Sequence, residues 1–341
     1  MAKNWKAPRI GSAFAACTIL AAALFFLTFP HGKNADASSV PELLAALPPG
    51  APSLVYVDLA AVRDSSFYQH RPNKGPLAVP NQEYSEFMRV TGFDFEKDLD
   101  RVVIASWPPA SVKEKTRTMG IAEGRFDRAK IRSYAMQKAK VEQQQGHEVF
   151  LFASGTLSTS SMFFLDDHRI GFVTGPSIVP FFAARTGDST ADPARERAAR
   201  LDGAAAFIIS RVPPIPENAA AGSAQGAGTE QLLTLARSIQ WITFAARPEG
   251  DNLRLSLEGE CDNSADAHQL QSMLEVMRMF GRAGLESPKN KQSIDPATFA
   301  QLESLLSSAE VKQTDERVRI LLELTPDIFK LSGPAKAQEP K

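Results

Sequence analysis

The sequence predicts an α+β protein: two tandem halves with antiparallel sheets behind an N-terminal apolar helix. Short β-rich runs and amphipathic stretches follow one another as strand, helix, strand, strand, helix, strand, and this order occurs twice. An E-G-x-apolar-D segment stands within each half, at Glu123–Asp127 and at Glu258–Asp262. This element order is typical of the ferredoxin-like β-α-β-β-α-β motif, so we expect two such units.

The N-terminal segment contains an uncharged apolar run of 20 residues, from Ile10 to Phe29. As a helix it would extend about 30 Å, which is enough to cross the hydrocarbon core of a bilayer. Three basic residues precede it: Lys3, Lys6 and Arg9. The positive-inside rule therefore places the N-terminus in the cytoplasm and the body on the other side of the membrane.

The fate of residues 1–37 has two alternatives. The length of the run favours an uncleaved anchor, which would make the chain a single-pass inner-membrane protein with its body in the periplasm. The segment Ala35-Asp36-Ala37 fits a signal-peptidase site, and cleavage after Ala37 would release the body into the periplasm. The membrane is the first expected partner, through residues 10–29.

The composition beyond this segment fits a soluble body. The whole chain has a formal net charge of −1, and removing residues 1–37 takes away +3 and leaves −4. No basic stripe is left to follow a phosphate backbone, which disfavours nucleic-acid binding. Only Cys261 lies outside the N-terminal segment, so the body cannot form an internal disulfide.

The domain organisation follows from the repeated order of elements. We expect a first half at residues 38–186, a polar linker at 187–200, a second half at 201–332 and a disordered tail at 333–341. Four pairs of segments correspond between the halves, at offsets of 152, 140, 135 and 170 residues. Because the offsets drift, the repeat depends on the shared order of elements more than on identity.

The first half begins with a strand at Leu54–Asp58, and a second strand at Val102–Trp107 ends at a proline. The segment Glu123–Asp127 then ends a strand and opens a helix. Later elements are two strands, a hairpin and a helix. Their ranges are Val141–Gln143, Val149–Phe152, Met162–Val173 and Ser177–Arg185.

The second half repeats this plan with strands at Ala206–Ser210 and Ile242–Pro248, and a tight turn at Glu249–Asn252 leads to the next strand. Leucines alternate along that strand, and helices and two short strands follow. The expected helices are Thr229–Ser238, Ala265–Phe280 and Pro296–Ser308; the expected last strands are Val311–Gln313 and Val318–Leu321.

A search for catalytic motifs finds no nucleophile elbow, phosphate-binding loop, zinc helix or calcium loop. The closest candidate is Asp166-Asp167-His168, where two carboxylates and an imidazole could bind a divalent cation or move a proton. Its apolar flanks favour a simple polar turn between two strands. His147 beside Glu148 is interpreted in the same way, so we assign no catalytic, metal-binding or cofactor-binding residue and predict no cofactor.

Long loops after the first strand of each half are the other candidates. Residues 70–80 and 213–228 are rich in Pro, Gly and Ala, which suits either binding loops or passive flexibility. Phe181 and Phe182 could face a ligand, but core packing is the favoured interpretation. The same holds for three methionines at helical spacing: Met273, Met277 and Met279.

The segments Leu54–Arg63, Gly92–Val102 and Glu123–Asp127 resemble a group of uncharacterised exported bacterial proteins. In that group a pseudo-repeated α+β body follows an N-terminal signal or anchor, and the resemblance covers most of residues 41–325. It implies no activity, substrate or catalytic residue.

Two functional hypotheses follow. The favoured one is a non-enzymatic binding or interaction module of the cell envelope, exported or anchored in the inner membrane, with a protein or another envelope component as its partner. The alternative is a hydrolase or metal-assisted enzyme that uses Asp166, Asp167 and His168.

Overall fold

The computed structural model describes residues 40–70, 82–109, 116–154, 158–183, 192–214 and 236–330. Among these residues no helix is long and apolar enough to cross a membrane. The expected anchor at residues 10–29, the tail at 333–341 and nearly all of the two candidate loops lie outside the described residues.

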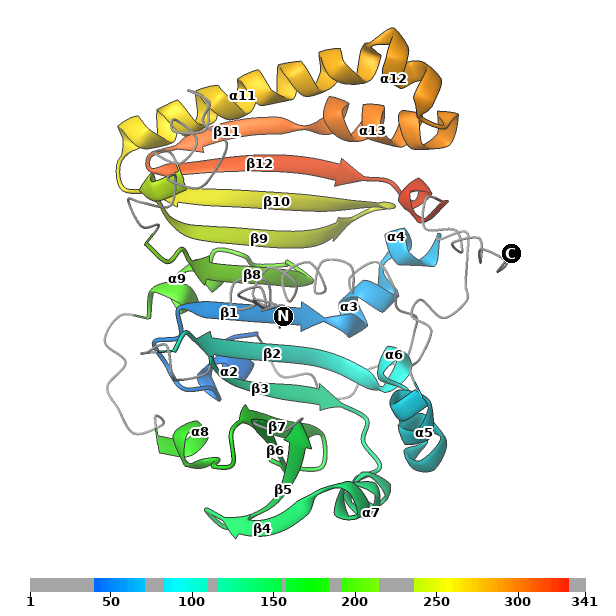
Figure 1. Ribbon diagram of the computed structural model, residues 1–341, viewed down its shortest axis with the longest axis vertical. Coiled ribbons are helices and arrows are strands. Elements are labelled where there is room, and N and C mark those ends of the chain that lie inside the picture. The colour runs from blue at the N-terminus through cyan, green and yellow to red at the C-terminus, as the bar shows by residue number, and fades with distance from the viewer. Residues whose placement is uncertain are drawn as a thin grey trace, which may run out of the picture.

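A single antiparallel sheet of twelve strands forms the centre of the molecule (Figure 1). Its strand order is β11-β12-β10-β9-β8-β1-β2-β3-β7-β6-β5-β4. The first half contributes β1 (Ser53–Asp58), β2 (Leu99–Trp107), β3 (Arg117–Gly124), β4 (Lys140–Gln144), β5 (His147–Ser154), β6 (Ser158–Phe164) and β7 (Arg169–Thr174). The second half contributes β8 (Ala206–Arg211), β9 (Ile239–Glu249), β10 (Asn252–Cys261), β11 (Glu310–Thr314) and β12 (Arg317–Leu324).

Helices lie on both faces of this sheet and along its ends. Those of the first half are α2 (Val40–Ala45), α3 (Leu59–Asp64), α4 (Ser66–Gln69), α5 (Gln82–Thr91), α6 (Phe95–Asp98), α7 (Arg128–Lys138) and α8 (Val179–Ala183). Later in the chain come α9 (Pro193–Ala198), α11 (Ser264–Glu286), α12 (Pro288–Ser293), α13 (Pro296–Ser308) and the 3₁₀ helix η3 (Pro326–Lys330).

The α+β class and the antiparallel pairing agree with the sequence, but two separate ferredoxin-like sheets are not observed. In a split β-α-β unit the strands joined by the first helix are parallel, whereas β1 pairs directly with β2 in the antiparallel sense. The other edge of β1 pairs with β8, which joins the halves into one sheet. Element order does not determine strand order, because cross-strand packing selects the neighbours.

The strand pairing nevertheless follows a matching plan in the two halves. The hairpin β4–β5 pairs Lys140 with Leu151, and β11–β12 pairs Glu310 with Leu321, an offset of 170 residues in both strands. A difference arises because the hairpin β6–β7 lies between β3 and β5, while β10 pairs directly with β12.

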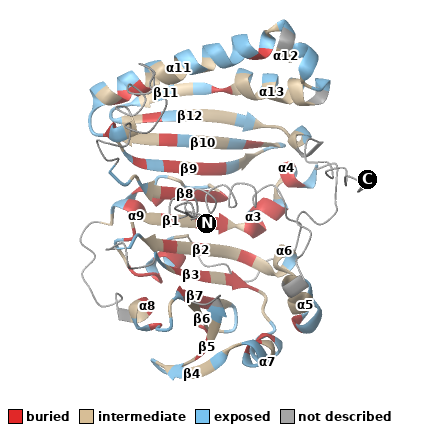
Figure 2. Ribbon diagram, in the orientation of Figure 1, coloured by how far each residue is buried: buried red, intermediate tan, exposed pale blue. Residues whose placement is uncertain are grey.

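Alternate residues of each strand point to opposite faces of the sheet. We call face A the side that carries Tyr56, Val103 and Phe207, and face B the side that carries Val55 and Phe244. In the first half and at the β1–β8 seam, face A packs against α2, α8 and α9 in the largest apolar cluster. Figure 2 shows buried residues in red along β1, β8 and α9. Face B packs against α3, α4, α7 and α11 in smaller clusters.

Several local expectations hold and others need correction. Helix α13 has the expected bounds, and β6 and β7 form the expected hairpin. The region expected to be a polar linker contains α9, whose N-cap Asp192 accepts a hydrogen bond from the backbone of Arg195. Helix α11 runs six residues beyond the expected end at Phe280, and Gly281 lies inside it, where an added Cβ atom would be 3.7 Å from Leu306 of α13.

Of the expectations for aromatic, methionine and histidine side chains, one is confirmed and others are wrong. Phe181 is fully buried in the main core, as expected. Met277 and Met279 are 55% and 62% exposed, so the expectation that they pack in a core is wrong. His147 does not lie in a solvated turn, because its ring stacks on Phe182 with centroids 4.9 Å apart.

Candidate functional site

In the candidate turn Asp166-Asp167-His168, both carboxylates are paired with nearby arginines. Asp166 accepts a hydrogen bond from the Arg169 guanidinium at 2.6 Å and one from the backbone of His168 at 2.8 Å. Burial raises the pKa of Asp166, but these hydrogen bonds outweigh it and the pKa lies below its ordinary value. Asp167 is 80% exposed on its side chain and pairs with Arg128 at 3.1 Å.

These contacts give the polar-turn interpretation its physical basis. Among the described residues no group of three or more His, Cys, Asp or Glu is arranged to hold a metal ion. The hydrolase hypothesis therefore gains no supporting contact from this turn, and it stays a prediction.

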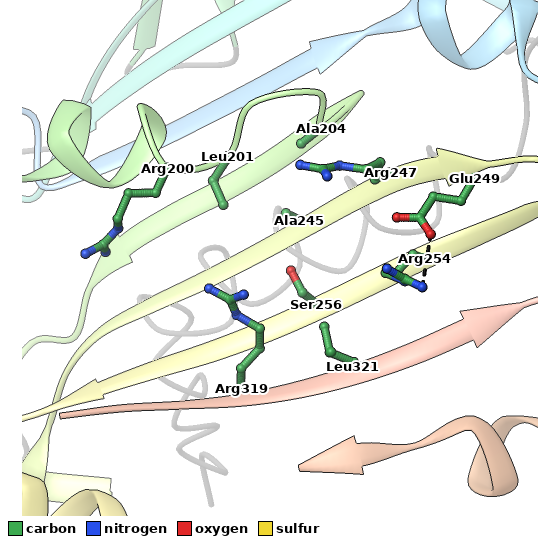
Figure 3. A pocket seen from close by; sticks show the side chains of 10 residues that line it. All are labelled: Arg200, Leu201, Ala204, Ala245, Arg247, Glu249, Arg254, Ser256, Arg319 and Leu321. Carbon is green, nitrogen blue, oxygen red and sulfur yellow. Dashed lines mark ion pairs between the residues drawn. The ribbon is translucent and has the colours of Figure 1, made fainter. Parts of the chain in front are cut away.

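A different site lies on face A of the second half, where the sheet carries charged side chains beside the end of α9 (Figure 3). The hollow has a volume of about 190 Å³. Ten residues line it: Arg200, Leu201, Ala204, Ala245, Arg247, Glu249, Arg254, Ser256, Arg319 and Leu321. Four arginines and one glutamate make this lining cationic.

The floor of the hollow is made of small side chains. Ala245 of β9 and Ser256 of β10 are directly paired across the ladder, and Ala204 lies beside them before β8. Arg247 and Arg319 stand on opposite sides of this floor, and the Ser256 hydroxyl is directed into the hollow (Figure 3). Because the floor residues are short, the guanidinium groups enclose open space instead of packing on larger side chains.

Carboxylates at the edge of the hollow hold some of the arginines. Glu258, which is buried, accepts hydrogen bonds from Arg319 at 2.5 and 3.0 Å. Arg200 lies 3.3 Å from Glu260 and 3.8 Å from Glu258. Bonds of this kind between charged groups orient the guanidinium groups before any ligand arrives.

Arg247 differs from the other arginines in its partners. Its guanidinium donates to the backbone carbonyl of Asp202, and among the described residues no carboxylate forms an ion pair with it. Arg254, in contrast, pairs with Glu249 at 3.0 Å at the far end of the hollow. Within the described part of the chain, Arg247 is therefore the arginine of the hollow with the least balanced charge.

The corresponding ladder positions of the first half are apolar. We align the two halves by placing Glu123 of β3 at the position of Glu258 of β10. In this alignment, the residues of β2 and β3 that correspond to the hollow are fully buried: Val103, Ala105, Met119 and Ile121. The second half has Ala245, Arg247, Arg254 and Ser256 at these positions. The same face of the sheet is thus a core in one half and a charged surface in the other.

Sequence reasoning missed this site, although a signal was present. The alternating leucines of β10 place the residues between them, Arg254, Ser256 and Glu258, on the opposite face. The tight turn after β9 then brings Arg247 opposite Arg254. The contribution of Arg319 and Arg200 could not be read without the strand order.

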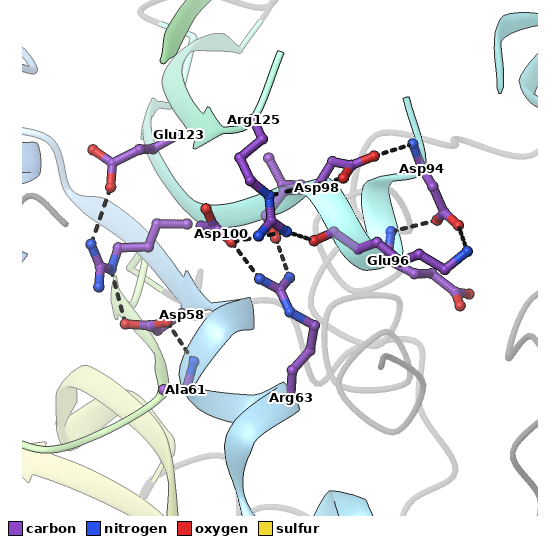
Figure 4. A network of polar contacts seen from close by, with 12 residues as sticks. Asp58, Ala61, Arg63, Asp94, Glu96, Asp98, Asp100, Glu123 and Arg125 are labelled. Carbon is purple, nitrogen blue, oxygen red and sulfur yellow. Dashed lines mark hydrogen bonds and ion pairs between the residues drawn. The ribbon is translucent and has the colours of Figure 1, made fainter. Parts of the chain in front are cut away.

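A second depression lies at the junction of the halves, with a volume of about 410 Å³ and Tyr56, Asp58 and Asp64 in its lining. Of these three residues, Asp58 has a partner drawn in Figure 4, the backbone of Ala61. Asp58 accepts hydrogen bonds from Tyr56, Arg101 and the backbone of Ala61 at 3.2, 2.9 and 2.8 Å. Burial raises the pKa of Tyr56 well above its ordinary value. We interpret this cluster as structural.

Comparison with known proteins gives little further guidance. No family model matches the chain, and no curated protein matches it. Among solved structures, crystal form III of TP0453 is similar with a TM-score of 0.45 and 10% identity, covering 87% of this chain and 99% of that one. Crystal form I of TP0453 gives a TM-score of 0.44 and 9% identity over 87% and 98% of the two chains. Similarity at this level carries no functional inference.

Proposed function

We propose that this chain is a non-enzymatic binding module of the cell envelope that captures an anionic partner on face A of its second half. The observation that carries the proposal is the arginine-lined hollow over the floor of Ala245 and Ser256. A depression lined mainly by positive charge attracts negatively charged ligands.

The chemistry of the lining supports binding over catalysis. A guanidinium group keeps its proton throughout the physiological pH range, so it can bind and orient an anion but cannot act as a general base. The acidic residue in the lining, Glu249, is paired with Arg254. Ser256 is the hydroxyl in the lining, and the described residues place no histidine among the lining residues that could activate it.

The expected location belongs to the same proposal. The apolar run at residues 10–29 and the basic residues before it would carry the body out of the cytoplasm, either tethered or released after Ala37. N-terminal sequencing of the mature chain, with protease accessibility in intact and permeabilised cells, distinguishes the two forms. A body protected from protease by the cytoplasmic membrane would contradict export.

Duplication is the proposed origin of the two halves. The matching hairpin registers and the paired E-G-x-apolar-D segments support it. On this view, the first half kept apolar residues on face A, and the second half exchanged them for the arginines of the hollow.

Photocrosslinking tests the proposed binding surface directly. A photoreactive residue at Leu321, inside the lining, is compared with one at Arg282, which is exposed on α11 outside the hollow. We expect a discrete adduct, detected by mass spectrometry, from Leu321 and not from Arg282 in native cells. Equal adduct patterns at the two positions, or adducts from Arg282 alone, would contradict the proposal.

A further inference from the structure

We infer that the hollow recognises a phosphate monoester group. The inference rests on the proposed function, because it names the ligand class of the same site. It depends on three features: the directions from which donors approach, the room above the floor, and the unequal pairing of the arginines.

Donors reach the hollow from opposite sides and from below. Arg247 enters from β9, Arg319 from β12, and the Ser256 hydroxyl from the floor (Figure 3). A planar carboxylate has two oxygens, which one guanidinium fork can satisfy. A phosphate monoester carries three terminal oxygens in a tetrahedral arrangement, so it can accept from two facing guanidinium groups and a hydroxyl at once.

The room above the floor fits a group of this size. The hollow of about 190 Å³ is more than ten times the roughly 10–15 Å³ that, on the same measure, a cavity needs to hold one water molecule. A larger side chain at Ala245 or Ser256 would fill this space. The first half shows that outcome, with Ile121 where the second half has Ser256.

The pairing of the arginines indicates how much charge the ligand should carry. Arg319 and Arg200 already share the carboxylates of Glu258 and Glu260, so they can give only part of their charge to a ligand. Arg247 has no such competitor among the described residues and serves as the main anchor. A dianion competes with the neighbouring glutamates better than a monoanion does, which again favours the monoester.

The test is calorimetric titration of the full chain in detergent with inorganic phosphate, glycerol phosphate and succinate at one ionic strength. We expect both phosphates to bind and succinate to bind at least about tenfold more weakly. Arg247→Ala should lower the phosphate affinity by at least about tenfold, the loss expected for one hydrogen bond to a charged group. Arg247→Lys should give an intermediate loss, because lysine keeps the charge and lacks the fork.

The control variant is Arg282→Ala, which removes an exposed arginine outside the hollow and should leave the phosphate affinity unchanged. A competition arm with phosphatidic acid in the same micelles shows whether a lipid-borne phosphate displaces glycerol phosphate or whether the site takes only soluble esters. Circular dichroism and the urea midpoint verify that each variant is folded.

Each outcome has a separate meaning. If succinate binds as tightly as phosphate and both depend on Arg247, the phosphate assignment is wrong, while the binding function of the hollow holds. If phosphate binding is absent, or equal in the folded Arg247→Ala variant, the inference is overturned. Crosslinking from Leu321 to a partner without phosphate would then leave the proposed function standing.

Discussion

The two glycines of the E-G-x-apolar-D segments should respond differently to the same substitution. A Cβ atom added to Gly124 would lie 2.3 Å from the backbone carbonyl oxygen of Asp98 and 3.1 Å from the Cα atom of Leu99. A Cβ atom added to Gly259 would meet only side-chain carbons, the nearest at 3.6 Å on Leu270, which is ordinary contact.

The expected magnitudes follow from these distances. At Gly124 the clash is with backbone, so no side-chain rotation relieves it, and overpacking of this kind costs about 1–3 kcal/mol. The Arg125 backbone also donates to the Asp98 carbonyl at 2.7 Å, and disturbing that bond adds about 0.5–1.5 kcal/mol. In both variants, alanine should raise the free energy of unfolding by about 0.5–1 kcal/mol, because glycine loses more backbone entropy on folding than alanine does. Gly124→Ala should therefore lose about 0.5–4 kcal/mol net, with about 2 kcal/mol as the central value, whereas Gly259→Ala should be neutral or slightly stabilising.

Equilibrium urea unfolding of Gly124→Ala, Gly259→Ala and the unaltered chain measures the difference. The matched pair keeps the substitution and the motif position the same, while Gly124 ends β3 against the backbone of Asp98 and Gly259 lies inside β10. Equal changes in the unfolding free energy for the two variants, or a larger loss for Gly259→Ala, would show that the close approach at Gly124 does not control its tolerance.

Three further predictions concern other parts of the molecule. Arg63 is fully buried and pairs with Asp100, so Arg63→Ala should cost about 3–5 kcal/mol in urea unfolding, while Arg63→Met with Asp100→Leu should cost less than the two single changes together. Met279→Gln and Phe280→Ser should change the unfolding free energy by less than about 0.5 kcal/mol, because both side chains are exposed on α11; a larger loss would reveal packing there. Burial raises the pKa of the Cys261 thiol, so iodoacetamide at neutral pH should alkylate it more slowly in the folded chain than in urea, and equal rates would contradict this.

Local signals in the sequence were enough to find several elements. Asp295 and Pro296 predict the start of α13, and in the structure the Asp295 side chain accepts from the backbone of Thr298 at 3.0 Å. The polar residues at 166–168 predict the turn between β6 and β7, and Asp166 bonds within that turn. These features depend on residues two or three apart, which the sequence displays directly.

Features set by distant contacts could not be predicted. Helix α11 continues six residues past the expected end at Phe280, and it packs against α12 and α13, which no local pattern displays. The strands β1 and β8 pair although they are about 150 residues apart in the sequence. No local sequence pattern distinguishes this single continuous sheet from the two separate sheets that we expected. The hollow has the same origin, because Arg247 and Arg319 come together only through the ladders from β9 to β10 and from β10 to β12.

The seam between β1 and β8 explains why the two halves should act as one unit. Tyr56 and Phe207 are paired across it, both are almost fully buried, and their rings stack at 5.2 Å. Face A at this seam belongs to the main core, which continues through Phe207 and Ile209 to Ala245 of β9. Ala245 is also the floor of the hollow. The main core of face A therefore reaches into the second half as far as β9, while the second half packs α4 and α11 on face B. An antiparallel sheet with one packed face can carry charged side chains on the other, which is where the arginines of the hollow lie.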